Sequence, residues 1–323
     1  GGLGTITGLT QGTPEKLANE IARCKEMTDK PFAVNLTFLP SLTPPDYPGL
    51  VDVIIDGGVP IGDTAGRNPA EYLPALKEAG IKAGDKINIT VPTGNFGNIL
   101  AAYYAYRMGL PVKKFICASN DNKVLTDFLE TGIYNIEREF KKTISPSMDI
   151  LISSNLERFL FEMTAHDSSK INSWYQNLKS ENKFEIDQQT KSKIKELFSG
   201  HFSSESESKA VIKSTFDNFN YLLDPHTAVG VDALYKYRQR SGDQTTAVVA
   251  STANPYKFSR AVLESLKEEK INKDEYQIIA DLEKLTSTDI HRGLKGLENM
   301  ESRHNHSCDK NSVKEKVAEI LKL

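Results

Sequence analysis

The sequence predicts an α/β protein built on an open sheet of parallel strands with flanking helices. Short β-branched and aromatic runs alternate with stretches of helical periodicity along most of the 323 residues. Strands that alternate with helices pair in parallel, because each helix carries the chain back to the start of the next strand. The clearest single unit is a strand at residues 86–91, a glycine-bearing turn at 92–98 and an Ala-rich helix at 99–108.

Residues 1–82 are expected to form further β/α units. A helix should begin after Thr13, whose hydroxyl can cap it, with Pro14 in its first position. Another should open at residues 68–71, where Glu71 is placed for a capping box. The expected strands are residues 32–38, 51–55 and 59–61.

Beyond the glycine turn the pattern continues. Residues 112–118 and 245–250 are predicted strands, and a helix is predicted at 121–130. Residues 165–223 are polar and rich in Lys, Glu and Ser, so we expect a small helical subdomain there. The other expected features are a capping box between Ser204 and Glu207, a helix capped by Asp224 that continues to Tyr237, and short amphipathic helices at the end of the chain.

The glycine turn has the features of an anion site. The first N–H groups of a helix have no partners within it and lie at the positive end of its dipole. Gly94 and Gly97 lack the Cβ atoms that would keep a phosphate from the backbone. The spacing is neither that of a dinucleotide-binding loop nor that of a nucleoside-triphosphate loop. The alternative is that the two glycines only form a tight turn between strand and helix, with Asn98 as the helix cap, because such a turn has the same spacing.

Composition excludes several classes of function. A formal net charge of −3 gives no basic footprint for nucleic acid, and no apolar run approaches the ~20 residues that span a bilayer. Cys24, Cys117 and Cys308 are scattered and odd in number, which favours a reducing, cytoplasmic compartment over a disulfide framework. His304 and His306 have no second cluster to complete a metal site, so none is expected. No signal peptide is evident, and because residue 1 is Gly, the sequence is expected to begin inside a longer gene.

From about residue 83 to the end, the chain resembles threonine synthase. The likeness starts with P-T-G-N-F-G-N-I-L-A-A-Y-Y at residues 92–104. It continues, in the family's order, at residues 118–120, 143–149, 152–158, 224–229 and 250–258. The resemblance implies pyridoxal-phosphate fold type II and a lyase of threonine biosynthesis that converts O-phosphohomoserine and water to threonine and phosphate.

The site residues follow partly from chemistry and partly from this resemblance. The backbone N–H groups that can ring the phosphate of pyridoxal phosphate belong to Gly94, Asn95, Phe96, Gly97 and Asn98. The resemblance implies that Thr252 contacts the pyridine nitrogen of pyridoxal phosphate. Without the resemblance, Thr252 would be expected to cap the helix that begins at Pro255. Ser153, Ser154 and Asn155 precede a helix, where they can bind a second anion such as a substrate phosphate or simply cap the helix.

Residues 1–82 resemble a different family, nitronate monooxygenase, an FMN-dependent β/α barrel. The likeness rests on G-G-L-G-T-I-T-G-L-T-Q-G-T-P-E, P-F-A-V-N-L-T-F-L-P and T-A-G-R-N-P-A-E-Y-L. The resemblance implies that Asn35 lies beside the flavin. The alternative is that Asn35 is only a polar residue at the end of a strand. Eight strands close such a barrel and only a partial one is present, so we expect no FMN binding by this segment. Its strands should pair with the following sheet or stay poorly ordered.

The two resemblances meet at residues 80–85, which makes the chain a chimeric fusion, whether natural, an assembly artefact or engineered. The threonine synthase family holds its Schiff-base lysine in an F-K-D-type motif upstream of the glycine loop. No lysine before Val91 lies in such a motif; these are Lys16, Lys25, Lys30, Lys77, Lys82 and Lys86. We therefore expect no threonine synthase activity from this chain alone. The alternatives are an FMN-dependent nitronate monooxygenase and a catalytically silent phosphate-binding fragment.

Overall fold

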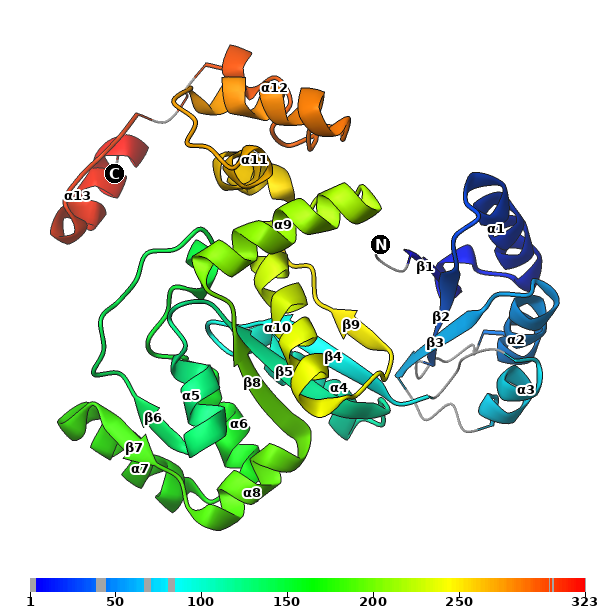
Figure 1. Ribbon diagram of the computed structural model, residues 1–323, viewed down its shortest axis with the longest axis horizontal. Coiled ribbons are helices and arrows are strands. Elements are labelled where there is room, and N and C mark those ends of the chain that lie inside the picture. The colour runs from blue at the N-terminus through cyan, green and yellow to red at the C-terminus, as the bar shows by residue number, and fades with distance from the viewer. Residues whose placement is uncertain are drawn as a thin grey trace.

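The computed structural model describes residues 4–38, 45–66, 71–80, 85–301, 303 and 305–322 (Figure 1). Its strands form two separate parallel sheets and one small antiparallel pair. The first sheet has the order β1-β2-β3 and the second β8-β5-β4-β9. The α/β fold with parallel sheets and flanking helices is therefore as predicted.

The N-terminal unit, blue in Figure 1, has its own hydrophobic core. Its strands are β1 (Gly4–Thr7), β2 (Phe32–Phe38) and β3 (Ile61–Gly66), and its helices are α1 (Pro14–Met27), α2 (Tyr47–Asp56) and α3 (Leu73–Glu78). The hydroxyl of Thr13 accepts the Lys16 N–H and Pro14 opens α1, as predicted. Of the two expected outcomes, pairing with the following sheet or poor order, the pairing does not occur, because β1, β2 and β3 pair only with one another among the described strands.

Two further predictions for this unit need correction. The strand predicted at 51–55 is helical and lies inside α2, where Leu50, Val51 and Ile54 point into the core. A short apolar run does not distinguish a buried strand from a buried helix, and here the Asp46 side chain caps the helix by accepting the Gly49 N–H. The strand predicted at 59–61 lies later, in β3. The helix start predicted at 68–71 falls largely outside the described residues.

The second sheet forms the middle of a three-layer sandwich. Its strands are β4 (Ile87–Pro92), β5 (Val112–Ser119), β8 (Phe198–Phe202) and β9 (Ala247–Val249), all mutually parallel. Helix α10 (Pro225–Ser241) packs on the face that carries Ile116 and Ala118. The opposite face carries Phe115, and its core includes buried residues of α4 (Gly97–Arg107), α5 (Val124–Thr131), α6 (Leu156–Met163) and α8 (Gln188–Leu197). Because the strands are parallel, their carboxyl ends share one edge of the sheet.

Residues 165–223 are mostly helical, as predicted, but they also complete the sheet. The helices are α7 (Ser168–Glu181), α8 and α9 (Glu205–Phe219), and the predicted capping box at Ser204 and Glu207 is present. Strand β7 (Lys183–Glu185) pairs with β6 (Ile133–Asn135), and β8 pairs with β5. Gly200 lets β8 approach α5, because a Cβ there would lie 2.9 Å from the Thr126 Cα. A glycine and a histidine in the centre of a strand weaken its sequence signal.

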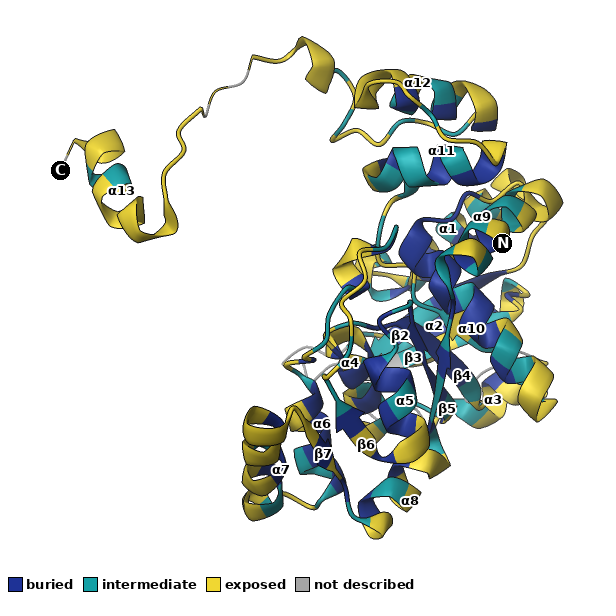
Figure 2. Ribbon diagram, turned by 60° about the vertical axis from the view of Figure 1, so that its left-hand side comes forward, coloured by how far each residue is buried: buried dark blue, intermediate teal, exposed yellow. Residues whose placement is uncertain are grey.

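The C-terminal helices are α11 (Ser259–Lys267), α12 (Glu275–Thr286) and α13 (Val313–Leu321). Helices α9, α11 and α12 contribute to one small core, whereas α13 has no buried residue (Figure 2). Within the described ranges, no helix is both long and apolar enough to cross a membrane.

Candidate phosphate-binding site

The glycine loop follows β4 at the carboxyl edge of the second sheet. Thr93 anchors it, because its N–H donates to the Ala118 carbonyl at 2.8 Å and its hydroxyl to the Val91 carbonyl at 2.6 Å. The Phe96 ring is fully buried and lies 5.1 Å from the Phe159 ring. Phe96 also has a left-handed backbone, with φ of 61°. This conformation turns the chain into α4, so Phe96 occupies the cap position and the alternative assignment of Asn98 as the cap is wrong.

The loop presents a run of unused N–H donors. The first helical hydrogen bond of α4 is donated by Leu100 to the Phe96 carbonyl at 3.2 Å. The N–H groups of residues 94–99 have no acceptor in the described parts of the chain. Asn95, Gly97 and Asn98 are exposed to solvent. A left-handed residue followed by a helix start brings such N–H groups together in an anion-binding concavity, so this backbone can hold a phosphate.

The two glycines have different roles. A Cβ at Gly97 would meet nothing closer than the Asn155 Nδ2 at 3.6 Å, so Gly97 leaves the surface of the concavity open. A Cβ at Gly94 would lie 2.9 Å from the Met148 Cα and 3.0 Å from the Ser147 carbonyl oxygen. Gly94 therefore permits close packing of another segment, and only Gly97 suits the predicted approach of a ligand.

The predicted triplet of Ser153, Ser154 and Asn155 lies against this loop. The Ser153 hydroxyl donates to the Gly94 carbonyl, and the Ser154 N–H and hydroxyl donate to the Asn95 Oδ1 at 2.7 and 2.9 Å. The Asn155 Nδ2 donates to the Asn95 carbonyl at 2.9 Å and makes no capping bond to α6. These side chains hold the glycine loop, which is a different task from ordinary helix capping.

A segment that we call the strap, residues 143–152, also contacts the loop, where Ser147 and Met148 pack against Gly94. Asp149 accepts hydrogen bonds from the Thr143 N–H at 2.9 Å and from the Asn120 Nδ2 at 2.7 Å. The Tyr134 hydroxyl accepts the Ser153 N–H at 2.8 Å, just past the end of the strap. The strap is thus fixed to the carboxyl end of β5, and the sequence predicted none of these contacts.

Thr252 lies in the next loop along the same edge. The Ala250 N–H donates to the Thr90 carbonyl at 2.9 Å, which extends β9 beside β4. Thr252 is exposed, and its hydroxyl has no hydrogen-bond partner in the described chain. Asn254 caps the following 3₁₀ turn by accepting the Tyr256 N–H at 2.9 Å, so Thr252 is not the cap. A depression of about 410 Å³ at this position is lined by Tyr221, Leu222, Asp224, Ser251, Thr252, Ala253, Asn254 and Pro255.

Other candidate groups are engaged elsewhere. The Asn35 side chain donates to the Asp63 carboxylate at 2.8 Å and accepts the Thr37 hydroxyl at 2.7 Å within the N-terminal sheet. Burial raises the pKa of the Cys117 thiol to about 12, so this cysteine beside the loop is a packed thiol and not a nucleophile. His304 lies outside the described residues. Among those described, no group of three or more His, Cys, Asp or Glu residues is placed to hold a metal ion.

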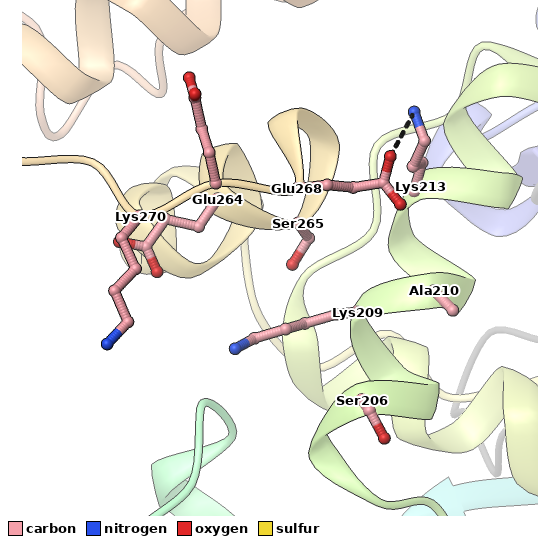
Figure 3. A pocket seen from close by; sticks show the side chains of 9 residues that line it. Ser206, Lys209, Ala210, Lys213, Glu264, Ser265, Glu268 and Lys270 are labelled. Carbon is pink, nitrogen blue, oxygen red and sulfur yellow. Dashed lines mark ion pairs between the residues drawn. The ribbon is translucent and has the colours of Figure 1, made fainter.

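A second cavity, of about 360 Å³, lies between α9 and α11 (Figure 3). Two of its three lining lysines pair with carboxylates. Lys213 lies 3.9 Å from Glu268, and Lys209 lies 2.7 Å from Glu205. With positive and negative side chains in contact, the cavity has no net preference for an anion, and we assign it no ligand.

Comparison with known proteins supports the C-terminal resemblance. Residues 227–317 match the family model described as threonine synthase, C-terminal. The protein named Threonine synthase-like 1 from Pongo abelii is 43% identical over 202 residues, which is 62% of this chain and 27% of that protein. Threonine synthase from Saccharomyces cerevisiae is 35% identical over 253 residues, which is 74% of this chain and 48% of that enzyme. The chain thus spans between about a quarter and a half of these relatives.

Two solved structures share the fold. The pyridoxal-phosphate-bound threonine synthase from Brucella melitensis aligns with a TM-score of 0.55 and 32% identity, covering 78% of this chain and 55% of that one. The yeast threonine synthase aligns with a TM-score of 0.62 and 23% identity, covering 98% of this chain and 69% of that one. These matches bear on the threonine synthase resemblance, and the nitronate monooxygenase resemblance of residues 1–82 stays a prediction. The chain therefore carries a threonine synthase-like C-terminal domain on an α/β fold of the pyridoxal-phosphate type II class.

Proposed function

We propose that this chain binds pyridoxal phosphate as a threonine synthase-like protein, with the cofactor phosphate held by Gly94, Asn95, Phe96, Gly97 and Asn98. The observation that carries this proposal is the run of N–H groups at residues 94–99 that lack acceptors in the described chain. A phosphate would meet these donors at the positive end of α4, and no hydrogen bond among the described residues would have to break first.

Other residues of the proposed site would contact the pyridine ring of the cofactor and the phosphate of the substrate. The free hydroxyl of Thr252 would contact the pyridine nitrogen and leave that nitrogen largely unprotonated, because a hydroxyl is not a carboxylate. Ser154 and Asn155 would lie beside a substrate phosphate, with Arg158 as the adjacent positive charge, since its guanidinium donates to the Asn155 Oδ1 at 2.7 Å. When bound, the cofactor supplies an electron sink for proton transfers next to the amino group of the substrate.

The proposed substrate is O-phosphohomoserine, which the family converts with water to threonine and phosphate. We propose that this chain alone does not complete the reaction. A lysine that joins the cofactor needs burial or a cationic neighbour to make its amine nucleophilic. Lys16, Lys25, Lys30, Lys77 and Lys86, the described lysines before Val91, are all exposed.

The division of the chain is also a proposal. We place the boundary between residues 82 and 83. The proposal is supported by the two sheets, because no described strand of one pairs with a described strand of the other. For residues 1–82 we propose no flavin binding, since both polar atoms of the Asn35 side chain are already hydrogen-bonded inside the sheet.

The test is titration of the purified protein with pyridoxal phosphate, followed by absorption. Gly97→Val should weaken binding, because its side chain enters the concavity, while Gly4→Val is the control, since a Cβ at Gly4 meets nothing within 4 Å. Equal affinities in the two variants would contradict the proposed phosphate site.

Borohydride reduction with peptide mapping, together with an assay of threonine formation, tests the predicted inactivity. One stoichiometrically labelled lysine with threonine produced would overturn that prediction, and a stoichiometric flavin in the protein would favour the monooxygenase alternative.

A further inference from the structure

A buried histidine lies behind the candidate site. His226, in the first turn of α10, is 3% exposed. Its Nε2 accepts the Ser147 N–H at 3.2 Å, and its Nδ1 lies 3.1 Å from the Asp224 Oδ1. A backbone N–H can only donate, so Nε2 is the unprotonated nitrogen. The proton is therefore on Nδ1, which donates to the buried Asp224 carboxylate.

The contact with Ser147 fixes the strap at the position where it touches the glycine loop. Ser147 and Met148 are the residues whose backbone atoms lie 2.9–3.0 Å from a Cβ placed on Gly94. The Phe258 ring, 4.7 Å from the imidazole, holds the other side of His226. Movement of Ser147 away from His226 would thus free the backbone against which the start of the loop rests.

Asp224 links the same histidine to the other end of the proposed cofactor site. Its Oδ2 accepts the Thr227 hydroxyl, which lies 3.2 Å from the Ser251 Oγ. Ser251 immediately precedes Thr252. The Asp224–His226 pair is therefore in contact with the segments that carry both the glycine loop and Thr252.

We propose that His226 is a positioning residue, which holds the N–H groups of residues 94–98 in their phosphate-binding arrangement through its Nε2 contact with Ser147. The proposal rests on the proposed binding of a phosphorylated cofactor by this loop. It assigns His226 no contact with the ligand. His226 fixes Ser147 in the strap, and the strap packs against Gly94. The Nδ1 contact with Asp224 orients the imidazole ring so that Nε2 faces the Ser147 N–H.

Two substitutions separate the contacts of the two ring nitrogens. The side-chain oxygen of His226→Gln reaches the position of Nε2 and can accept the Ser147 N–H. The amide of His226→Asn reaches only the position of Nδ1, so it keeps the Asp224 contact and leaves Ser147 without its acceptor. Inorganic phosphate and pyridoxamine phosphate serve as probes, because neither has an aldehyde that reacts with surface lysines. Thermal unfolding and amide hydrogen exchange are measured on the same full chains.

We expect about fivefold weaker binding of both probes to His226→Asn and affinity within twofold of the unmodified protein for His226→Gln. Faster exchange of the Ser147 and 94–98 amides should accompany the first variant and not the second. Equal affinity and exchange in the two variants, or changes that only follow their melting temperatures, would overturn the positioning role. If the unmodified chain binds neither probe, the proposed function fails. The ligand-free exchange rates then still decide whether His226 fixes the loop.

Discussion

Replacement of Gly94 by Ala should destabilise the protein even without any ligand. The new methyl group would meet the Met148 Cα at 2.9 Å, the Ser147 carbonyl oxygen at 3.0 Å and the Ile150 Cδ1 at 3.1 Å. Two of these three atoms are backbone, so they can retreat only if the strap moves. Overpacking of a well-packed region costs typically 1–3 kcal/mol, and we expect about 2 kcal/mol for this variant.

The matched control is Gly97→Ala in the same loop. Its methyl group has no neighbour closer than 3.6 Å, so the free energy of unfolding should change by less than ~0.5 kcal/mol. For a domain of this size, ~2 kcal/mol corresponds to a melting temperature about 4–8 °C lower. Thermal and urea unfolding of both variants measure the difference. Equal melting temperatures for the two variants would refute the assignment of Gly94 to packing against the strap.

Three further predictions follow from the same structure. Burial acts to raise the pKa of Asp243, but hydrogen bonds from the Thr245 hydroxyl, the Lys113 ammonium and other donors hold it well below its ordinary value. Asp243→Asn should therefore lose ~2–4 kcal/mol of unfolding free energy at pH 7 in urea titrations. The deficit in unfolding free energy should narrow below about pH 4, since a depressed carboxyl pKa contributes its full stability above the unfolded pKa and loses it as the pH falls toward the folded pKa. Phe96→Ala removes a fully buried ring and should cost ~3–5 kcal/mol in the same assay, whereas Asn95→Ala, an exposed neighbour, should cost less. Inorganic phosphate at about 100 times its Kd should raise the unfolding free energy of the unmodified protein by ~2.7 kcal/mol and that of Gly97→Val by less.

Local chemistry made much of the fold predictable. The cap at Thr13, the capping box at Ser204 and the helix start at Asp224 all rest on side-chain hydrogen bonds to neighbouring backbone, and each is present. The failures come from tertiary context. The apolar run at 51–55 can be buried as a helix as well as it can as a strand. The sequence of β8 is a weak strand former, but β8 forms because it pairs with the edge of β5.

The candidate site was predictable only in part, for a physical reason. The sequence shows which residues can donate or accept, and it placed an anion site at residues 94–98 from helix-terminus chemistry. It does not show which segments meet. His226 follows an Asp-Pro helix start, which usually lies at a surface, yet it is buried and accepts the N–H of Ser147 in the strap. The missing Cβ of Gly94 was attributed to the approach of a ligand, because the sequence does not show the packing of Met148 against Gly94, a contact across 54 positions.

The arrangement of the second sheet explains why so much of the proposed site lies away from the loop itself. Parallel strands β8, β5, β4 and β9 end at one edge, so segments that lie far apart between residues 93 and 254 meet there. Each segment is held by another: the strap by Asn120 and His226, the glycine loop by the triplet at residues 153–155. An array of N–H donors binds an anion well only if the donors are fixed before the anion arrives, because ordering them afterwards would consume part of the binding free energy. The hydrogen bonds that converge on Gly94 and Asn95 provide that fixation, while the donors themselves have no acceptor among the described residues.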